Sequence, residues 1–434
     1  MHHLSYCDVN SKSNGFWFNL EREAFEPIAI PDPYDRIEKM GKLWYGSTLL
    51  MIISNQLNHS IFFCGSTNCN GIQLTSQTTC SSWTHTPKPL ESMQFSNGEE
   101  VLDISEDSNL ILTNRRVLSF DGRSELDLEE LGQQVVQMSS QIQSLVLLRD
   151  GRVFGRGSNS AAQLGSWKPG YFVSWAYIPV FYDAGHLTEE ELLGDSLENG
   201  NVTQKIERLD PQEKIVKIVT GRLKSFFLTT RGRVIGCGEN ISHCLGFSEN
   251  LGSYHKVIQH MIITHTQSSF NSFSLRLADA FANDFVEDIV CCEGQNHHFC
   301  CVLTREKKLK ASGYYLSDST NIFMFGDDVT PSFCNDQVAQ IYSVGPLVLV
   351  ITKNKDALYF PQHKNTVNPY LDSLLTQVKS LVKFDERMYG KLRFSSGSGF
   401  WFDRLSDDLS SFWKQLKNMH SANPKLCDVC IQFQ

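Results

Sequence analysis

The sequence predicts an all-β fold: a seven-bladed β-propeller with two loop insertions and a short C-terminal amphipathic helix. Three observations predict it. A block of strand, tight turn, strand and Gly-rich loop recurs along the chain. The apolar runs have the length of short strands, and the same tetrapeptide occurs near both ends of the repeat region. Units of four short strands suit a propeller because no single unit can bury both of its faces without neighbours.

The clearest block is Asp150–Gly165. Asp150-Gly151 is predicted as a two-residue hairpin turn, because both positions tolerate a positive φ. It separates the strand-like runs 144–148 and 152–154, and a Gly-rich loop ending at Gly165 closes the block. By itself this pattern indicates only a hairpin.

Two further copies make the block a repeat. Ser225–Gly246 has the same order, with Arg231-Gly232 at the turn, and the spacing from Gly232 to Gly246 equals that from Gly151 to Gly165. Residues 61–74 form a third copy. A unit that recurs with a fixed order of strands and turns is typical of a repeat architecture.

These blocks resemble the regulator of chromosome condensation repeat. Its pattern runs from an apolar strand through Cys-Gly-x-x-His-Ser, Asp-Gly and Trp-Gly-x-Asn to Gln-Leu-Gly. Residues 290–304 resemble the first half best. Other copies depart from the pattern: Lys224 or Gln143 stands for the His, and Arg156 or Cys237 for the Trp. The resemblance implies the propeller more strongly than any particular partner.

Two other propeller families fit less well. The chain has no Trp-Asp dipeptide, only one Gly-His pair, at Gly185-His186, and no Gly-Gly pair. WD40 and kelch repeats would show these dipeptides. We therefore expect seven blades of the first type at the following positions: Trp44–Leu74, Val101–Leu131, Val135–Gly165, Ile215–Phe247, Val286–Asp318, Val338–Pro361 and Leu381–Leu405.

The two ends of the propeller are expected to meet. Gly-Phe-Trp-Phe occurs at 15–18 and again at 399–402. A closed ring often shares one blade between its first and last segments. We therefore predict that the strand at 16–20 lies beside the segment 381–405, within a propeller domain at 1–405.

Two insertions interrupt the repeats, at 166–212 and 248–285. The first carries aromatic residues and then an acidic piece, in which Thr188 and Glu191 have the spacing of a helix capping box. The second carries His255, His260 and His265 and a polar run at 266–274. Loops on a rigid scaffold often bind partners, and both insertions are equally compatible with surface excursions of no function.

The residues 406–434 differ in kind. Residues 406–420 have a helical pattern, with Ser406 as cap and apolar residues on one face. A break at Pro424 precedes a strand-like run that contains Leu-Cys-Asp-Val at 426–429. This order resembles the opening of a BTB domain, which implies a linker helix and the start of that domain. A cap that packs on the propeller is the alternative interpretation.

Composition limits the class of protein. The formal net charge is −9, from 48 acidic and 39 basic residues, and no run of five basic residues exists. This disfavours a nucleic-acid surface. No signal peptide is recognisable at the first residues, and the longest aliphatic runs are far below the ~20 residues of a membrane span. The 13 Cys residues suit reduced, buried thiols. We expect a cytoplasmic protein, with the nucleus as an alternative and with no membrane partner.

No catalytic, cofactor or metal site is predicted. Six residues resemble a zinc cluster: Cys291, Cys292, His297, His298, Cys300 and Cys301. Adjacent strand residues point to opposite faces, so half of them cannot share a metal ion. The pair Cys427 and Cys430 lies on a predicted strand and not at a helix N-terminus, where a redox thiolate would be stabilised.

Two functional hypotheses follow from the resemblances. The first is a non-enzymatic scaffold whose propeller loops bind a protein partner, and which recruits substrates to a cullin ubiquitin ligase through a complete BTB domain. The second is a guanine-nucleotide exchange factor, or a regulator, of a small GTPase, which is the activity of the founding family. No residue of this chain can be assigned to such exchange, so fold analogy alone supports the second hypothesis.

Overall fold

A computed structural model describes the chain in short segments. They are residues 15–19, 24–28, 30–33, 36–42, 49–54, 59–66, 68–69, 72–73, 83–89, 99–105, 110–119, 125–128, 134–165, 170–178, 212–247, 272–294, 297–317, 320–330, 338–344, 347–354, 357–361, 392–395 and 399–402. In these segments the regular structure is almost entirely antiparallel β-sheet, so the all-β prediction is confirmed. No helix of the described residues is long and apolar enough to cross a membrane.

Seven sheets of three or four strands follow one another along the chain, and we number them I to VII. Sheet I contains β3 (Arg36–Lys42), β4 (Leu49–Ser54), β5 (His59–Ser66) and β8 (Trp83–Pro89). Sheet II contains β9 (Val101–Ile104), β10 (Leu110–Thr113), β11 (Arg116–Ser119) and β12 (Glu125–Asp127). Sheet III contains β13 (Val135–Ser140), β14 (Gln143–Leu148), β15 (Val153–Ser158) and β16 (Tyr171–Ile178).

The later sheets have the same strand order. Sheet IV contains β17 (Ile215–Thr220), β18 (Lys224–Thr229), β19 (Val234–Glu239) and β20 (Ser272–Leu277). Sheet V contains β21 (Val286–Gly294), β22 (His297–Thr304), β23 (Leu309–Ser317) and β24 (Thr320–Asp328). Sheet VI contains β25 (Val338–Val344), β26 (Leu347–Thr352) and β27 (Ala357–Phe360), and sheet VII contains β28 (Leu392–Ser395), β29 (Gly399–Phe402), β1 (Gly15–Asn19) and β2 (Ala24–Pro27). A two-stranded ribbon of β6 (Asn68–Cys69) and β7 (Ile72–Gln73) and the short 3₁₀ turns η2 (Ile241–His243) and η3 (Asp279–Phe281) complete the elements.

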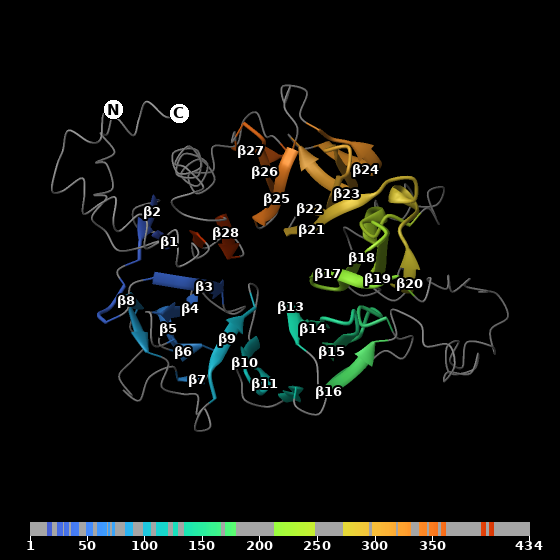
Figure 1. The fold of residues 1–434 in the computed structure, drawn as a ribbon. Coiled ribbons are helices and arrows are strands. Elements are labelled where there is room, and N and C mark those ends of the chain that lie inside the picture. Colours follow the sequence, from blue (N-terminus) through green and yellow to red (C-terminus); the bar gives the residue numbers. More distant parts are fainter. Residues whose placement is uncertain are drawn as a thin grey trace, which may run out of the picture.

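The sheets lie around a common centre (Figure 1). The first strand of each sheet, such as β3, β13, β17 or β21, lies nearest that centre, and the fourth lies at the periphery. Contacts join sheet VII to sheet I and each of sheets I to V to the next: β28 and β29 to β3, β3 to β9, β12 to β16, β14 to β17, β17 to β21, and β21 to β25.

Sheet VII is built from both ends of the chain. β1 pairs with β29 in antiparallel register, with Phe16 opposite Phe400 and Trp17 opposite Gly399. The two Gly-Phe-Trp-Phe segments are therefore neighbouring strands, which is the arrangement expected for the strand at 16–20. The C-terminal segment supplies only two strands of this sheet, β28 and β29, so the predicted blade Leu381–Leu405 is half a sheet.

Sheets II, III, IV and VI are covered on both faces at their second strand. Every residue of β10, β14, β18 and β26 is buried. Side chains alternate along β14: Leu145 and Leu147 pack against sheet IV, whereas Val146 and Leu148 pack against sheet II. A strand that is buried on both faces reads as a continuous apolar run, which explains why these strands were recognisable in the sequence.

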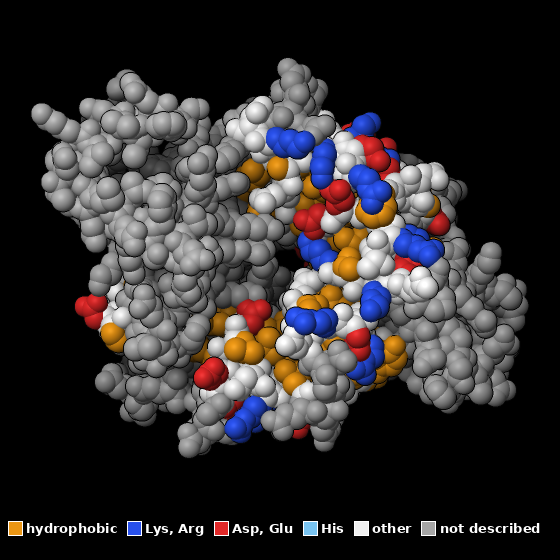
Figure 2. Space-filling model, viewed as in Figure 1, with side chains coloured by type: hydrophobic (Ala, Val, Ile, Leu, Met, Phe, Trp, Pro, Cys, Tyr) orange, Lys and Arg blue, Asp and Glu red, His pale blue; other side chains and the backbone are white. Residues whose placement is uncertain are grey.

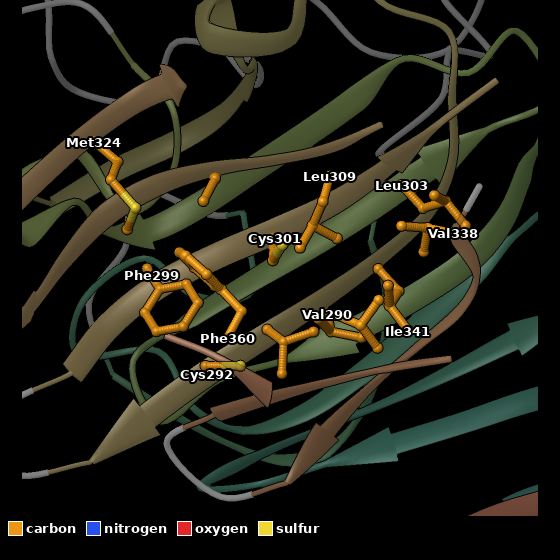
Figure 3. Close-up of a cluster of buried hydrophobic side chains, with 13 residues drawn as sticks. Val290, Cys292, Phe299, Cys301, Leu303, Leu309, Met324, Val338, Ile341 and Phe360 are labelled. Atoms are coloured by element: carbon orange, nitrogen blue, oxygen red, sulfur yellow. The ribbon is translucent and has the colours of Figure 1, made fainter. Parts of the chain in front are cut away.

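The space between sheets V and VI shows how neighbouring sheets are joined (Figure 3). Phe299 and Cys301 of β22 point from sheet V into the same cluster as Val338 and Ile341 of β25 and Phe360 of β27. The rings of Phe299 and Phe360 meet edge to face, with centroids 5.7 Å apart. Such a contact adds to the burial of apolar area, which is the main stabilising contribution between the sheets.

Equivalent glycines of the repeats have equivalent backbone conformations. Gly151 and Gly232 at the turns have φ of 95° and 70°, and Gly157 and Gly238 have φ of 97° and 107°. A Cβ atom on Gly238 would lie 2.2 Å from the carbonyl oxygen of Leu223. Only glycine fits such a position, so the recurrence of these residues has a backbone cause.

The predicted repeats missed the outermost strand of several sheets. β16 and β20 lie inside the segments predicted as insertions, β8 lies beyond the predicted end at Leu74, and β24 extends to Asp328 rather than ending at 318. The first sheet also begins at Arg36, ahead of the predicted Trp44. The connection from the third to the fourth strand differs in length from sheet to sheet, so the outer strand has no fixed place in the repeat, although β16 itself is rich in apolar residues.

Several predicted features lie outside the described residues. These are the capping box at 188–191, the histidines at 255, 260 and 265, the helix at 406–420 and the strand-like run at 426–433. They stay predictions.

The shared sheet VII yields a test of ring closure. Trp17 is paired on both sides, opposite Glu26 and Gly399, so Trp17→Pro removes an N–H from the middle of the sheet. We expect the urea midpoint of unfolding to fall, because the two ends of the chain lose their connection. Trp17→Phe keeps the N–H and is the control; equal midpoints for the two variants would contradict the role of this pairing.

Candidate interaction surface

A bulge recurs in the innermost strands of sheets I to VI. In β13 the register passes from Val135 opposite Leu148 to Gln137 opposite Leu147, so Val136 has no partner. The same one-residue shift occurs in the other five strands. The residues that have no opposite residue in the strand register, which we call the bulge residues, are Glu38, Leu102, Val136, Val216, Glu287 and Ala339.

The bulges turn apolar side chains toward solvent. Leu102, Val136 and Val216 are 56%, 52% and 50% exposed, although they lie in strands whose other apolar residues are mostly buried. A bulge redirects one side chain and is over-represented near functional sites. Three consecutive sheets, II to IV, therefore present an exposed apolar residue at the same position near the centre of the ring.

In sheets II to VI, the turn between the second and third strand lies at the same end as these bulges. The first turn residue donates its N–H to the carbonyl of the residue that precedes the innermost strand: Asn114 to Glu100, Arg149 to Gln134, Thr230 to Lys214 and Arg305 to Phe285, at 2.8–2.9 Å. We call this end of the ring the turn end. It consists of the turns 114–115, 149–151, 230–232, 305–307 and 353–354 together with the bulge residues.

Every one of these five turns carries an exposed basic residue. They are Arg115, Arg149, Arg231, Arg305 and Lys353. Figure 2 looks onto one end of the ring, where Lys and Arg side chains and Asp and Glu side chains are interspersed over the described part, with apolar side chains between them. The turns thus place positive charge around the apolar bulge residues.

Buried carboxylates hold further arginines at the base of the turns. Arg116 donates to Glu99 from Nε at 2.8 Å and from Nη2 at 2.9 Å, and Arg233 binds Glu213 in the same two-pronged way. The side chains of Glu99 and Glu213 are fully buried, whereas those of the arginines are 26% and 33% exposed. The acidic partner faces inward and the basic partner outward, and such bidentate pairs are geometrically specific.

Close contacts between sheets keep the turn end rigid. A Cβ atom on Gly151 would lie 2.9 Å from Cβ of Lys214 in the next sheet, and one on Gly232 would lie 2.7 Å from the ring of Phe285. The Arg305 guanidinium lies over that Phe285 ring, with Cζ 3.4 Å from the centroid. The turns are therefore packed against the following sheet and are not free loops.

Polar contacts between innermost strands reach the opposite end of the ring. The Gln137 amide donates to the carbonyl of Ile218 and accepts from its N–H, at 2.8 and 2.9 Å. Gln143 donates to the carbonyls of Gly221 and Lys224, both at 2.8 Å. These bonds fix the relative register of sheets III and IV.

An ion pair is buried between sheets IV and V. Lys224 donates to Glu293, and the side chains are only 3% and 18% exposed. The backbone N–H of Arg222 donates to the second Glu293 oxygen at 2.5 Å. Lys224 occupies the position at which the resembled repeat has His, so this contact is particular to the present chain.

The pair shifts the pKa of both partners. Burial by itself would lower the pKa of Lys224, but Cys244, Glu293 and Cys291 hold it well above its ordinary value. Burial would likewise raise the pKa of Glu293, but the Lys224 charge and hydrogen bond and the Arg222 N–H hold it below its ordinary value. Both groups are therefore charged at neutral pH. Burial raises the pKa of the nearby Glu239 instead.

The cysteine and histidine cluster is divided as the strand pattern predicts. Cys291 and Cys300 pack toward sheet IV, whereas Cys292 and Cys301 pack toward sheet VI. Figure 3 shows Cys292 and Cys301 among apolar side chains. Within the segments that the structure describes, no group of three or more His, Cys, Asp or Glu residues is placed to hold a metal ion. For His297 only the backbone is described, and Cys427 and Cys430 lie outside the described residues.

The described thiols are buried and protonated. Burial raises the pKa of Cys237 and Cys292 to about 12 and that of Cys244 to about 11. It raises the pKa of Cys291, Cys300 and Cys301 as well. A thiolate is the reactive form, so these residues act as core side chains.

One feature of the turn end was visible in the sequence but is not part of the repeat pattern: a recurring basic residue. The copies from the second to the sixth sheet show a basic residue in the second turn, for example in Asn114-Arg115, Arg231-Gly232 and Lys353-Asn354. The bulges left no such sign, because a residue without a partner looks like any other strand residue. Prediction had placed binding in the insertions, whose described parts are mainly the outer strands β16 and β20.

Comparisons with known proteins give limited information. No protein-family model and no sequence among the curated proteins matches the chain. Similar solved structures include human WBSCR16 (13% identity, 78% of each chain covered, TM-score 0.49) and Prp20p of Saccharomyces cerevisiae, described with its binding to Gsp1p and histones (11%, 73% of this chain and 68% of that one, 0.44). Yeast RCC1 (Prp20) bound to Kap60 is another (12%, 89% and 85%, 0.48). The structural neighbours thus include RCC1-type β-propellers. The arrangement of the sheets in this chain is inferred from its own strand order and packing.

Removal of Glu293 tests the buried pair. At neutral pH, Glu293→Gln leaves the Lys224 charge buried without its carboxylate and should lower the free energy of unfolding by about 3 kcal/mol, the lower end for such a loss because Glu293 is partly exposed. Glu239→Gln is the control, because burial disfavours the charge on Glu239. An equal loss of unfolding free energy in the two variants, measured by urea unfolding, would contradict a stabilising ion pair between Lys224 and Glu293.

The same pair predicts a dependence on pH. The folded pKa of Glu293 is below its unfolded value, so its stabilisation is complete above about pH 5 and is lost as the pH falls through the folded pKa. The difference in unfolding free energy between the wild type and Glu293→Gln should therefore be constant from pH 7 to about 5 and shrink below about 4. A difference that persists unchanged in acid would mean that the Gln variant loses packing and not charge.

Thiol labelling tests the burial of the core cysteines. Peptides that contain Cys237, Cys244, Cys291, Cys292, Cys300 and Cys301 should remain unlabelled by iodoacetamide in the folded protein at pH 8 and become labelled in urea, as measured by mass spectrometry, because their thiols are buried and protonated. Rapid labelling of Cys291 or Cys300 in the folded state would show that the junction between sheets IV and V is open.

Proposed function

We propose that the chain is a non-enzymatic scaffold for protein–protein interaction, built as a seven-bladed β-propeller. The observation that carries the proposal is the turn end, where exposed apolar bulge residues and basic turn residues share one rigid surface. A patch with an apolar centre and a polar rim has the anatomy of a protein interface. The cytoplasm or nucleus is its proposed location.

The seven blades are supported by strand order and packing. Six described sheets have four strands and one has three, and contacts join sheet VII to sheet I and each of sheets I to V to the next. The pairing of β1 with β29 brings the last sheet back to the first. A single closed ring uses all of these contacts at once.

The more specific adaptor function depends on the C-terminal segment. Recruitment of substrates to a cullin ubiquitin ligase requires a complete BTB domain, and the residues that resemble its start, 406–434, lie outside the described part of the chain. In a chain that contains such a domain, the proposed role of the propeller is to recruit substrates to the ligase.

Regulation of a small GTPase is the second candidate. Its supporting fact is that a neighbouring structure, Prp20p, is described with its binding to Gsp1p. That neighbour shares only the broad architecture with this chain. The second proposal makes one prediction: the bound partner is a GTPase whose nucleotide release the chain accelerates.

Partner recovery separates these functions. The full chain, tagged and cross-linked in cells, should recover a discrete protein partner, and Leu102→Ser/Val136→Ser/Val216→Ser should reduce that recovery about tenfold because it removes the exposed apolar centre. Recovered GTPases are then tested for nucleotide release. Acceleration would favour the exchange function, recovery of cullin only by a chain that extends beyond Gln434 would favour the adaptor, and no discrete partner would overturn the scaffold.

A further inference from the structure

The arrangement of charge at the turn end is asymmetric. The carboxylates that hold Arg116 and Arg233 are fully buried, and the carboxylate of Asp284, which binds Lys310 at 2.8 Å, is only 14% exposed. The turns above these pairs expose Arg115, Arg149, Arg231, Arg305 and Lys353. The basic side chains of these turns are exposed, and the carboxylates of the three neighbouring ion pairs lie mostly inside, although the chain as a whole carries a net charge of −9.

The basic residues surround an apolar centre and do not form a continuous basic track. Leu102, Val136 and Val216 project from the innermost strands on the same end. The exposed acids Glu100, Glu287 and Glu306 lie among the turns. A phosphate backbone would meet apolar side chains in the middle of this surface, whereas nucleic-acid surfaces present a continuous concentration of positive charge.

From this geometry we propose that the turn end binds an acidic protein segment that carries apolar side chains. The assignment rests on the proposed scaffold function and names the chemistry of its partner. The apolar side chains of the segment contact Leu102, Val136 and Val216, and its carboxylates face the basic residues of the turns. Charge complementarity of this kind increases the rate of association and selects the partner, while the apolar contact supplies most of the affinity.

The rigidity of the turns favours this binding. The turns of sheets II to V are hydrogen-bonded to the innermost strands, and Gly151 and Gly232 pack against the following sheet. Arginines on such a base lose less conformational freedom on binding than arginines on mobile loops, so less of the interaction energy is spent on ordering.

A second apolar surface lacks this combination. β16 exposes Tyr171, Val173 and Tyr177 at the edge of sheet III, with exposed fractions of 65%, 69% and 43%. No charge pattern on that strand identifies the chemistry of a partner. It serves as the comparison surface in the test.

The test uses four labelled probes, three peptides and one DNA, whose binding to the full chain is measured by fluorescence anisotropy. The first is a short labelled peptide in which Asp and Glu alternate with Leu and Phe. The second replaces the acids by Asn and Gln, and the third replaces the apolar residues by Ser. A short duplex DNA is added as a fourth probe. The proposal expects the first peptide to bind most tightly and to weaken as salt is raised.

Matched variants locate the binding surface. Arg115→Glu/Arg149→Glu/Arg231→Glu should weaken binding of the first peptide at least about tenfold, whereas Lys at the same three positions should change it less than about threefold. Val136→Ser/Val216→Ser should weaken binding of the first peptide but not binding of the third peptide, which has Ser in place of its apolar residues. Tyr171→Ser/Val173→Ser should have no effect. Circular dichroism and urea midpoints verify that each variant is folded.

Three outcomes would overturn the proposal. They are peptide binding that survives charge reversal, binding lost through the β16 variant instead, and DNA bound more tightly than the acidic peptide with the same arginines required. The charge-reversed variant is also used in partner recovery from cells. Recovery that survives reversal contradicts this surface while leaving the scaffold function intact, whereas no partner with the wild type contradicts the scaffold function.

Discussion

The second strands of sheets II, III, IV and VI carry apolar side chains on both faces, and the rest of the structure depends on covering those faces. β14 and β18 are buried along their whole length, and alternate residues of β14 pack on sheets II and IV. A sheet of this kind has no stable form by itself, because its two faces need two neighbours. A row of such sheets leaves two faces uncovered at its ends, and a ring leaves none. The pairing of β1 with β29 supplies the connection that a ring requires.

This constraint separates what the sequence could predict from what it could not. Strands buried on both faces were recognisable as apolar runs, and the turn glycines as repeated positions, because each has a local physical cause. The outer strands β16, β20 and β24 were missed because connections of different length precede them, so they have no fixed spacing from the third strand of their sheet. The bulge residues, such as Val136, could not be found, because their exposure depends on the register of the pairing and not on residue type.

Buried charge and surface charge have different roles. The Lys224–Glu293 pair lies at the junction of sheets IV and V, where its pKa shifts follow from burial and mutual attraction, and it fixes two sheets relative to each other. At the turn end, Glu99 and Glu213 are buried beneath arginines whose side chains remain accessible. The same residue types thus stabilise the ring in one place and present positive charge in another. The candidate zinc ligands Cys291, Cys292, Cys300 and Cys301 are absorbed into the core between sheets.

Function in this account lies on the turn end, not in the best-preserved repeat. Asp150–Gly165 is a Gly-rich segment whose glycines have structural causes: Gly151, Gly157 and Gly165 have a positive φ, and Gly155 is packed against neighbouring side chains. The most direct measurement is amide hydrogen exchange of the full chain with and without the partner recovered from cells. The account predicts protection at the turns 114–115, 149–151, 230–232, 305–307 and 353–354 and at the bulges beside them. Protection confined to β16, or to the opposite end around Gly221 and Arg222, would contradict it.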